Sequence, residues 1–216
     1  MPRPGEVSLA HNGVLFLDEM LEFSRTALEV LRQPLEEGVV RIARAARTVA
    51  FPARFVLVGA MNPCPCGFAG DPVKECRCTP QQIDRYVSRL SGPLRDRLDL
   101  TVDVARLPSE MLGATNQAES SACMRERVVA ARDRQRGRYA DNGSLTNGTL
   151  ASADLRRFCS LDQGSLRMLR AAADRLGLSA RGFDRVRRVA RTIADLSSAD
   201  DISLEHVAEA LQFRGR

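Results

Sequence analysis

Two short apolar runs in the first half of the chain predict buried strands. The runs "GVLFL" (residues 13–17) and "FVLV" (residues 55–58) contain no charged residue, which is typical of parallel strands covered on both faces. The first run ends in Asp18 and Glu19, and the second is followed by Asn62. The pattern therefore predicts a parallel sheet with polar residues after the end of each strand.

The residues around and between these runs predict a hairpin, helices and one more strand. Apolar and basic residues alternate on both sides of Ala45–Ala46 in "VVRIARAARTVAF", which predicts a β-hairpin with an exposed arginine face. Leucines at helical spacing in residues 23–38 predict a helix capped by Ser24 or Thr26 and ended by Gly38, which Pro34 should kink or break near its last turn.

Residues 79–90 predict a helix with Thr79 as its cap and Pro80 in its first position. The alternation in "LDLTVDV" (residues 98–104) predicts another strand.

The strand pattern stops near residue 105. Residues 105–120 are rich in Pro, Gly, Ser and Asn, which indicates a linker. The remainder predicts helices in the segments 120–140, 152–159, 165–177, 179–197 and 203–213, and the last four are expected to begin at a serine cap. The expected fold is an α/β portion over residues 1–105, followed by an all-helical domain over residues 106–216.

Composition narrows the class of protein. An apolar share of 44% suits a folded chain, and no run of eighteen apolar residues predicts a membrane span. The N-terminus lacks a signal pattern, so we expect a cytoplasmic protein. The net charge of +5 permits contact with nucleic acid without requiring it, and an aromatic share of 5% without tryptophan argues against base stacking.

Lysine is almost absent from the basic residues. The only lysine is Lys74, which lies between Val73 and Glu75. A phosphate-binding P-loop reads G-x-x-x-x-G-K-[ST], and its lysine reaches the β- and γ-phosphates. Lys74 does not fit this pattern, so the sequence contains no P-loop.

Asp18, Glu19 and Asn62 are the strongest candidates for catalysis. Ligands of doubly wound sheets lie beyond the carboxyl ends of the parallel strands, where acids can hold Mg²⁺ and polarise an attacking water. An amide such as Asn62 could orient that water against a phosphate. The simpler alternatives are a surface turn with two solvated acids and an ordinary turn asparagine before Pro63.

Four cysteines lie close together in "CPCGFAGDPVKECRC". The pattern C-x-C, nine residues, C-x-C places Cys64, Cys66, Cys76 and Cys78 on one loop, enough thiolates for a tetrahedral zinc site. A redox pair and unligated cysteines remain alternatives, and a cytosolic chain disfavours structural disulfides.

The remaining cysteines and the histidines carry no motif. Cys123 and Cys159 stand alone in predicted helices and are expected in the core. Neither His11 nor His206 is expected to be a metal ligand.

Three arginines could contact a nucleotide. Arg95 and Arg97 precede the predicted strand at residue 98, and arginines at a subunit boundary can stabilise transition-state charge in trans. Solvated ion pairs with Asp96 or Asp99 are the alternative. Arg181 opens a predicted helix, where it could sense a nucleotide or remain a solvated first-turn residue.

Longer motifs carry a family resemblance. The stretches "PRPGEVSLAHNGVLFLDEM", "VGAMNPCPCG", "CRCTPQQIDRYVSRLSGPL", "DRLDL" and "LSARGFDRVRRVARTIADL" resemble the magnesium-chelatase-like AAA+ ATPases of the ComM (competence protein) type. The resemblance covers essentially the whole chain. It implies the latter part of an AAA+ nucleotide-binding core, without its P-loop and N-terminal domain, followed by a helical lid domain.

The resemblance also implies roles for individual residues. Asp18 and Glu19 match the Walker B pair, which binds Mg²⁺ and activates water, and Asn62 matches sensor 1. Arg97 matches the trans-acting arginine, although Arg95 remains an alternative, and Arg181 matches the sensor 2 arginine. The hairpin with Arg41, Arg44 and Arg47 matches an insertion that can face the pore of a ring and contact DNA.

The expected partners and cofactors follow from the same resemblance. Family members are ring-forming ATPases, so we expect ATP with Mg²⁺, a hexameric ring and sequence-independent DNA contact in the parent protein, with no membrane partner. ComM-type proteins are associated with DNA branch migration. The alternatives are a subunit that inserts magnesium into porphyrin and a zinc-stapled module that binds DNA or protein without catalysis. The chain alone is expected to be inactive.

Overall fold

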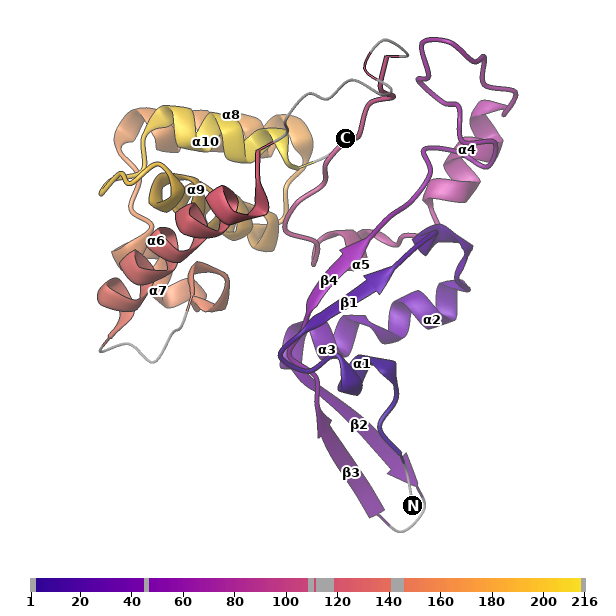
Figure 1. Ribbon diagram of the computed structural model, residues 1–216, viewed down its shortest axis with the longest axis horizontal. Helices are drawn as coiled ribbons and strands as arrows, with labels where there is room; N and C mark the ends of the chain where they lie inside the picture. Colours follow the sequence, from indigo (N-terminus) through magenta and orange to yellow (C-terminus); the bar gives the residue numbers. More distant parts are fainter. Residues whose placement is uncertain (1–2, 45–46, 109–110, 112–118, 141–145, 215–216) are drawn as a thin grey trace. The chain divides into compact units, whose positions relative to one another are not determined.

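The computed structural model describes residues 3–44, 47–108, 111, 119–140 and 146–214. These residues form two compact units, Met1–Leu98 and Asp99–Arg216, which Figure 1 colours from indigo to yellow along the chain. The sequence predicted the division near residue 105. Within the described residues, no helix combines the length and the apolar character needed to cross a bilayer.

The first unit contains the parallel pair of strands that the apolar runs predicted. Strands β1 (Val14–Leu17) and β4 (Val56–Gly59) pair in parallel, with Leu17 opposite Gly59. Leu15, Leu17 and Leu57 pack against the core on one face. The other face is exposed and apolar, and it carries Val14, Phe16, Val56 and Val58. A sheet of this kind normally has both faces covered.

Two short helices follow the first strand, so the helix predicted over residues 23–38 is broken, which is one of the two effects expected of Pro34. Helix α2 (Arg25–Val30) is capped by Ser24, which accepts from the amide of Ala27, and α3 (Arg32–Glu37) ends at Gly38 with a positive φ of 66°. The break at Leu31 lies before Pro34 rather than in the last turn. The proline ring conflicts with the carbonyl four residues earlier, at Val30, which explains that position.

The predicted hairpin is present and extends from its unit in Figure 1. Strands β2 (Val39–Arg44) and β3 (Arg47–Pro52) are antiparallel, with Arg44 opposite Arg47. Ala45–Ala46 lie outside the described residues.

The rest of the first unit consists of short helices around the core. They are α1 (Glu6–Leu9), the 3₁₀ helix η1 (Met20–Glu22), α4 (Pro80–Val87) and α5 (Gly92–Arg95). Thr79 caps α4 and forms the reciprocal capping box with Gln82, so the predicted cap is confirmed. Buried Leu21, Leu28, Tyr86 and Leu94 belong to the core that these helices share.

The predicted strand at residues 98–104 was wrong. These described residues form no strand, and Leu100, Val102 and Val104 are exposed. The amide of Thr101 donates to the carbonyl of Phe213 at 2.8 Å, but the structure shows no ladder along the segment. Alternation describes a strand only where a partner edge exists to pair with it.

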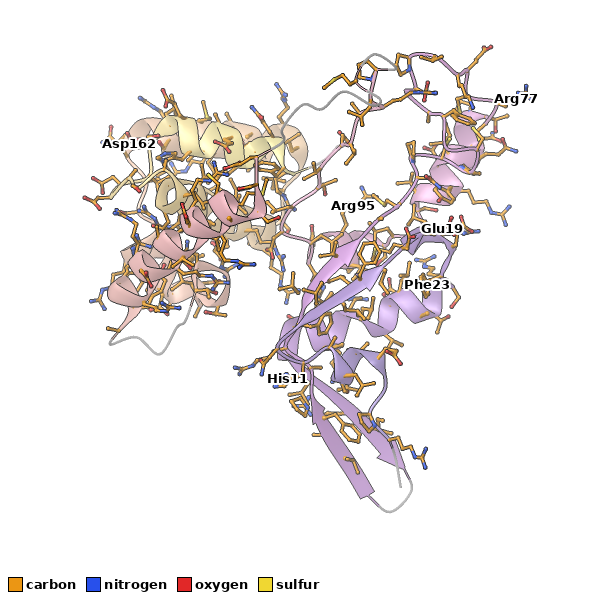
Figure 2. All side chains as sticks on the ribbon, in the orientation of Figure 1. His11, Glu19, Phe23, Arg77, Arg95 and Asp162 are labelled. Atoms are coloured by element: carbon orange, nitrogen blue, oxygen red, sulfur yellow. The ribbon has the colours of Figure 1, made fainter. Side chains whose placement is uncertain are left out.

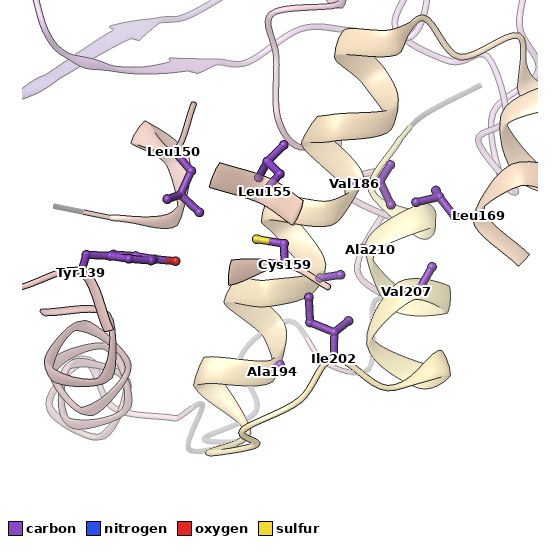
Figure 3. Packing of buried hydrophobic residues seen from close by; sticks show 11 residues of the cluster. Tyr139, Leu150, Leu155, Cys159, Leu169, Val186, Ala194, Ile202, Val207 and Ala210 are labelled. Atoms are coloured by element: carbon purple, nitrogen blue, oxygen red, sulfur yellow. The ribbon is translucent and has the colours of Figure 1, made fainter. Parts of the chain in front are cut away.

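The second unit is helical, as predicted. It consists of α6 (Ser121–Tyr139), the 3₁₀ helix η3 (Asn147–Thr149), α7 (Ser152–Phe158), α8 (Gln163–Leu176), α9 (Ala180–Leu196) and α10 (Leu204–Gln212). Figure 3 shows its core, in which Leu155, Leu169, Val186 and Val207 are fully buried. Residues 109–110 and 112–118 of the predicted linker, and 141–145 of the following loop, lie outside the described part.

Ser120 caps α6. Of the four serine caps expected in this unit, two are confirmed, at Ser179 and Ser203. The other two were wrong. Asp162 caps α8 by accepting from the amide of Ser165, and Ser152 lies inside α7, where its hydroxyl donates to Asp184 at 2.7 Å.

The expectation for the two lone cysteines was half right. Cys159 is buried in the helical core, but Cys123 is exposed because it lies in the solvent-facing N-terminal part of α6.

A buried polar network joins α6, η3 and α9. Asp195 is buried and accepts hydrogen bonds from Arg138 and from the side-chain amide of Asn147, both at 2.9 Å. Arg191 is also buried and lies 3.2 Å from Asp195. The carboxylate raises the pKa of Arg138, whereas burial lowers the pKa of Arg191.

Candidate functional site

The polar residues after β1 and β4 lie at one edge of the sheet. The two strands are parallel, and their pairing continues past their ends, because Ala60 donates to Leu17 at 2.9 Å and Met20 donates to Ala60 at 2.8 Å. Asp18 and Glu19 therefore lie opposite the segment that leads to Asn62. Figure 2 shows Glu19 at this end of the sheet and His11 at the other.

The acidic turn has a specific local conformation. Glu19 adopts a left-handed φ of 49°, which is uncommon for a residue with a side chain. Its amide donates to the carboxylate of Asp18 at 3.0 Å. Both side chains are exposed, as is Asn62. The arrangement leaves carboxylate and amide oxygens open to an incoming ligand.

Close packing below the turn fixes its position. A Cβ on Gly59 would stand 2.5 Å from the sulfur of Met20, so the strand end needs glycine for Met20 to be buried there. Arg89, after α4, donates to the carbonyl of Leu21 at 2.6 Å and pairs with Glu22 at 3.2 Å. Sequence reasoning missed Gly59 and Arg89, since no motif marks a contact across so many residues.

Arg97 is held within its own unit. Its side chain is 8% exposed, pairs with Glu36 from α3 and donates to the carbonyl of Pro93 at 2.7 Å. Arg95, labelled in Figure 2, is exposed. Sequence reasoning missed Glu36, which lies 61 positions away and has the appearance of a solvated helix residue.

Arg181 is the second residue of α9, after the cap at Ser179, and its side chain is exposed. It belongs to the helical unit, whereas Asp18, Glu19 and Asn62 belong to the first unit. Within its own unit, Arg181 therefore lies at the start of a helix, as predicted.

The hairpin presents basic residues from both strands. Arg41 is exposed and pairs with Glu37 at the end of α3. Arg44 and Arg47 are backbone register partners in the last pair of the two strands. Their side chains lie outside the described part, so only their backbone positions are known.

The four predicted cysteines come together. The sulfur atoms of Cys64, Cys66, Cys76 and Cys78 all lie within 4.8 Å of one another. Hydrogen bonds from the amides of Phe68 and Arg77 lower the pKa of Cys66 to about 6, and burial raises the pKa of Cys78. Soft thiolates at this spacing can hold a Zn²⁺ ion.

Comparison with family models divides the chain in two. Residues 1–112 match the model described as "Magnesium chelatase, subunit ChlI", and residues 118–214 match "Magnesium chelatase, subunit ChlI C-terminal". Both halves of the chain thus match parts of the same kind of protein.

Curated relatives are similar over the whole chain. The "Competence protein ComM" of Haemophilus influenzae is 47% identical over 216 residues, covering 99% of this chain and 41% of that protein. The "Uncharacterized protein YifB" of Escherichia coli is 45% identical with the same coverage. The "Magnesium-chelatase 38 kDa subunit" of Acidiphilium rubrum is 27% identical over 133 residues, which cover 59% of this chain and 36% of that protein. The chain spans about two fifths of the length of the first two relatives, 41% of each.

Proposed function

Because the chain belongs to the magnesium-chelatase-like, ComM-type family of AAA+ proteins, we propose that it is part of an ATP-hydrolysing motor that moves DNA branches. The observation that carries the proposal is the parallel pair β1–β4, with Asp18, Glu19 and Asn62 at one edge. Parallel strands that end in acids are the usual location of nucleotide-linked Mg²⁺ chemistry.

Each residue at this edge has a role that its chemistry suits. Asp18 would hold Mg²⁺, which neutralises charge on the phosphates when bound. Glu19 would accept a proton from the attacking water, and its exposed carboxylate is open to that water. Asn62 would orient the same water through its amide. The turn is already fixed by Met20 and Arg89, so these residues need little rearrangement.

The phosphate-binding part of the motor is expected from outside this chain. The exposed face of β1–β4 is apolar, with Val14 61% and Phe16 59% exposed, and parallel sheets are stable when both faces are covered. The remaining length of the relatives, of which this chain spans 41%, is enough for such a cover. Without backbone amides and a lysine to cradle phosphates, the chain alone should bind ATP weakly and hydrolyse it negligibly.

The arginines fit a ring of several copies, expected to be a hexamer. Arg97 would act in trans on the nucleotide of a neighbouring copy, and Glu36 would hold it until that copy binds. Arg181 would contact the nucleotide from the helical lid. Arg95, exposed at the end of α5, remains the alternative finger.

DNA would meet the β2–β3 hairpin. Arg41, Arg44 and Arg47 all belong to its two strands, and the chain carries a net charge of +5, which suits contact with a phosphate backbone without base readout. A cytoplasmic location is consistent with these partners. A structural Zn²⁺ on the four cysteines completes the proposed cofactors beside ATP and Mg²⁺.

Metal insertion into porphyrin is the second candidate, favoured by the match to the Acidiphilium rubrum subunit. The identity to ComM is higher, 47% against 27%, and covers more of the chain, which supports the first proposal over this one.

A chimera tests the proposal. This chain replaces the matching 41% of the Haemophilus influenzae relative, and ATP hydrolysis and migration of a four-way DNA junction are measured. We expect DNA-stimulated hydrolysis and junction movement. Replacing Arg41, Arg44 and Arg47 with alanine should weaken DNA binding and lower its salt slope by roughly one for each DNA phosphate that is no longer neutralised.

The control for this variant is Arg156→Ala and Arg157→Ala in α7, outside the hairpin. An active chimera that ignores DNA would contradict the DNA role. The isolated chain is titrated with ATP in parallel, and low-micromolar affinity would contradict the claim that the phosphate cradle lies elsewhere.

A further inference from the structure

The four-cysteine cluster has the dimensions of a tetrahedral metal site. Cys64 and Cys66 sulfurs are 3.4 Å apart, Cys64 and Cys76 are 3.7 Å apart, and Cys66 and Cys76 are 3.6 Å apart. Thiolates about 2.3 Å from a tetrahedral Zn²⁺ stand roughly 3.8 Å from one another. A disulfide brings two sulfurs to about 2.05 Å and leaves the others apart, whereas here three sulfurs are nearly equidistant.

Backbone amides point at these sulfurs. Ala69 donates to the sulfur of Cys64 at 3.3 Å, and the amides of Phe68 and Arg77 donate to Cys66. Such outer hydrogen bonds stabilise thiolates and orient them toward a metal. The loop backbone therefore supplies hydrogen-bond donors to two of the four sulfurs.

The loop that carries the cysteines has almost no other core. Residues 60–79 connect β4 to α4 without a helix or strand of their own, and Cys64 is the only buried residue among them. Local turns are present, such as Gly67 donating to Cys64 at 3.0 Å and Asp71 donating to Phe68 at 3.1 Å. A loop of this length in a compact domain requires a source of order that apolar burial does not supply here.

The same loop includes the candidate catalytic amide. Asn62 precedes Cys64 by two residues, and a Cβ on Gly67 would stand 4.0 Å from the side-chain oxygen of Asn62. An ion that fixes the backbone at Cys64 would therefore also restrain the backbone at Asn62, two residues earlier.

We propose that a Zn²⁺ ion bound by Cys64, Cys66, Cys76 and Cys78 is the core of the 60–79 loop and positions Asn62 at the edge of the sheet. Loss of zinc would release the loop and Asn62 together. The evidence for the metal site is the geometry of the four sulfurs. Only the effect that displacing Asn62 would have on ATP hydrolysis rests on the proposed function.

The experiment measures zinc and backbone order in the purified 216-residue chain. Elemental analysis should give one zinc per chain in the wild type and in Cys123→Ser, whose exposed thiol lies in α6. Cys76→Ser should lose the metal. On chelation, hydrogen exchange of amides in residues 64–78 should rise by about tenfold or more, and zinc should restore it, while α9 stays protected.

Any other outcome would refute a specific part of the zinc proposal. Wild-type chain without zinc and with four reactive loop thiols refutes the site, as does a Cys64–Cys66 or Cys76–Cys78 disulfide. Bound iron in place of zinc would refute the identity of the proposed metal. Zinc loss with unchanged exchange at residues 64–78 refutes its role in ordering the loop. If the Cys76→Ser chain does not fold, the reversible removal of zinc from the wild-type chain by a chelator still tests the proposal.

Positioning of Asn62 has its own readout. The side-chain amide signals of Asn62 in an NMR spectrum should shift on chelation, and those of Asn147 in the buried helical network should not. None of these measurements uses nucleotide, so an inactive chimera would contradict the proposed function and leave the metal site intact.

Discussion

Removing the buried carboxylate of Asp195 should strongly destabilise the helical unit. Asp195 accepts from Arg138 and Asn147 at 2.9 Å and lies 3.2 Å from Arg191, and its side chain is 0% exposed. Asp195→Ala leaves the guanidinium of Arg191, itself 3% exposed, without its carboxylate. Breaking a buried pair in this way typically costs about 3–5 kcal/mol.

The remaining hydrogen bonds place the expected loss near the lower end of that range. Arg191 keeps two carbonyl acceptors, those of Ala199 and Asp200, each at 2.7 Å. Arg138 is 19% exposed and can reach water. We therefore expect Asp195→Ala to lower the free energy of unfolding by about 3 kcal/mol, a large share of the roughly 5–15 kcal/mol typical of a domain.

The assay is urea unfolding of the whole chain, followed by circular dichroism and by hydrogen exchange of α9 amides. Exchange assigns the change to the helical unit. The matched control is Asp133→Ala, which removes an aspartate from a pair with Arg136 whose side chains are 59% and 72% exposed. That change should cost at most about 0.5 kcal/mol. An Asp195→Ala effect within about 1 kcal/mol of the control would refute the assigned role of the buried network.

Two further predictions concern the strand end and a helix cap. Gly59→Ala should destabilise the first unit by about 1 kcal/mol, because its Cβ would stand 2.5 Å from the Met20 sulfur. Gly137→Ala in α6 has open space around its Cβ and should stabilise the helical unit by up to about 1 kcal/mol. If both variants shifted the denaturant midpoint in the same direction, this reasoning would be contradicted. The hydrogen bond from the amide of Ser165 lowers the pKa of Asp162, so its stabilisation is complete above the unfolded pKa of about 4 and is lost as pH falls through the folded value. The stability difference between wild type and Asp162→Asn should therefore shrink in acid, and a difference that grows as pH falls below about 4 would be evidence against the cap.

Local chemistry was predictable from the sequence, and long-range contacts were not. Ser24, Thr79, Ser179 and Ser203 were identified because a cap depends only on the next few residues. The apolar runs of β1 and β4 were equally clear. The strand expected at residues 98–104 failed because pairing needs a partner edge, which alternation does not supply.

The candidate site shows the same division. Asp18, Glu19 and Asn62 follow apolar runs, and the four cysteines lie on one loop. Their spacing in the sequence was therefore enough to predict that each group lies together. The ion pair that buries Arg97 comes from Glu36, 61 positions away, and no local pattern indicates it. Cys123 was assigned to a core because helical position is visible in sequence, whereas the face that packs is not.

The central claim is that this chain supplies the residues of a nucleotide-hydrolysing site that bind Mg²⁺ and activate the attacking water. The most direct test is single-turnover ATP hydrolysis by the chimera with Glu19 intact and with Glu19→Gln, beside ATP binding measured on the same samples. The account predicts that Glu19→Gln binds ATP like the parent chimera and hydrolyses it about 10²–10⁴-fold more slowly, since only the proton acceptor is lost. Hydrolysis at the parent rate in Glu19→Gln, in a chimera that hydrolyses ATP, would contradict it.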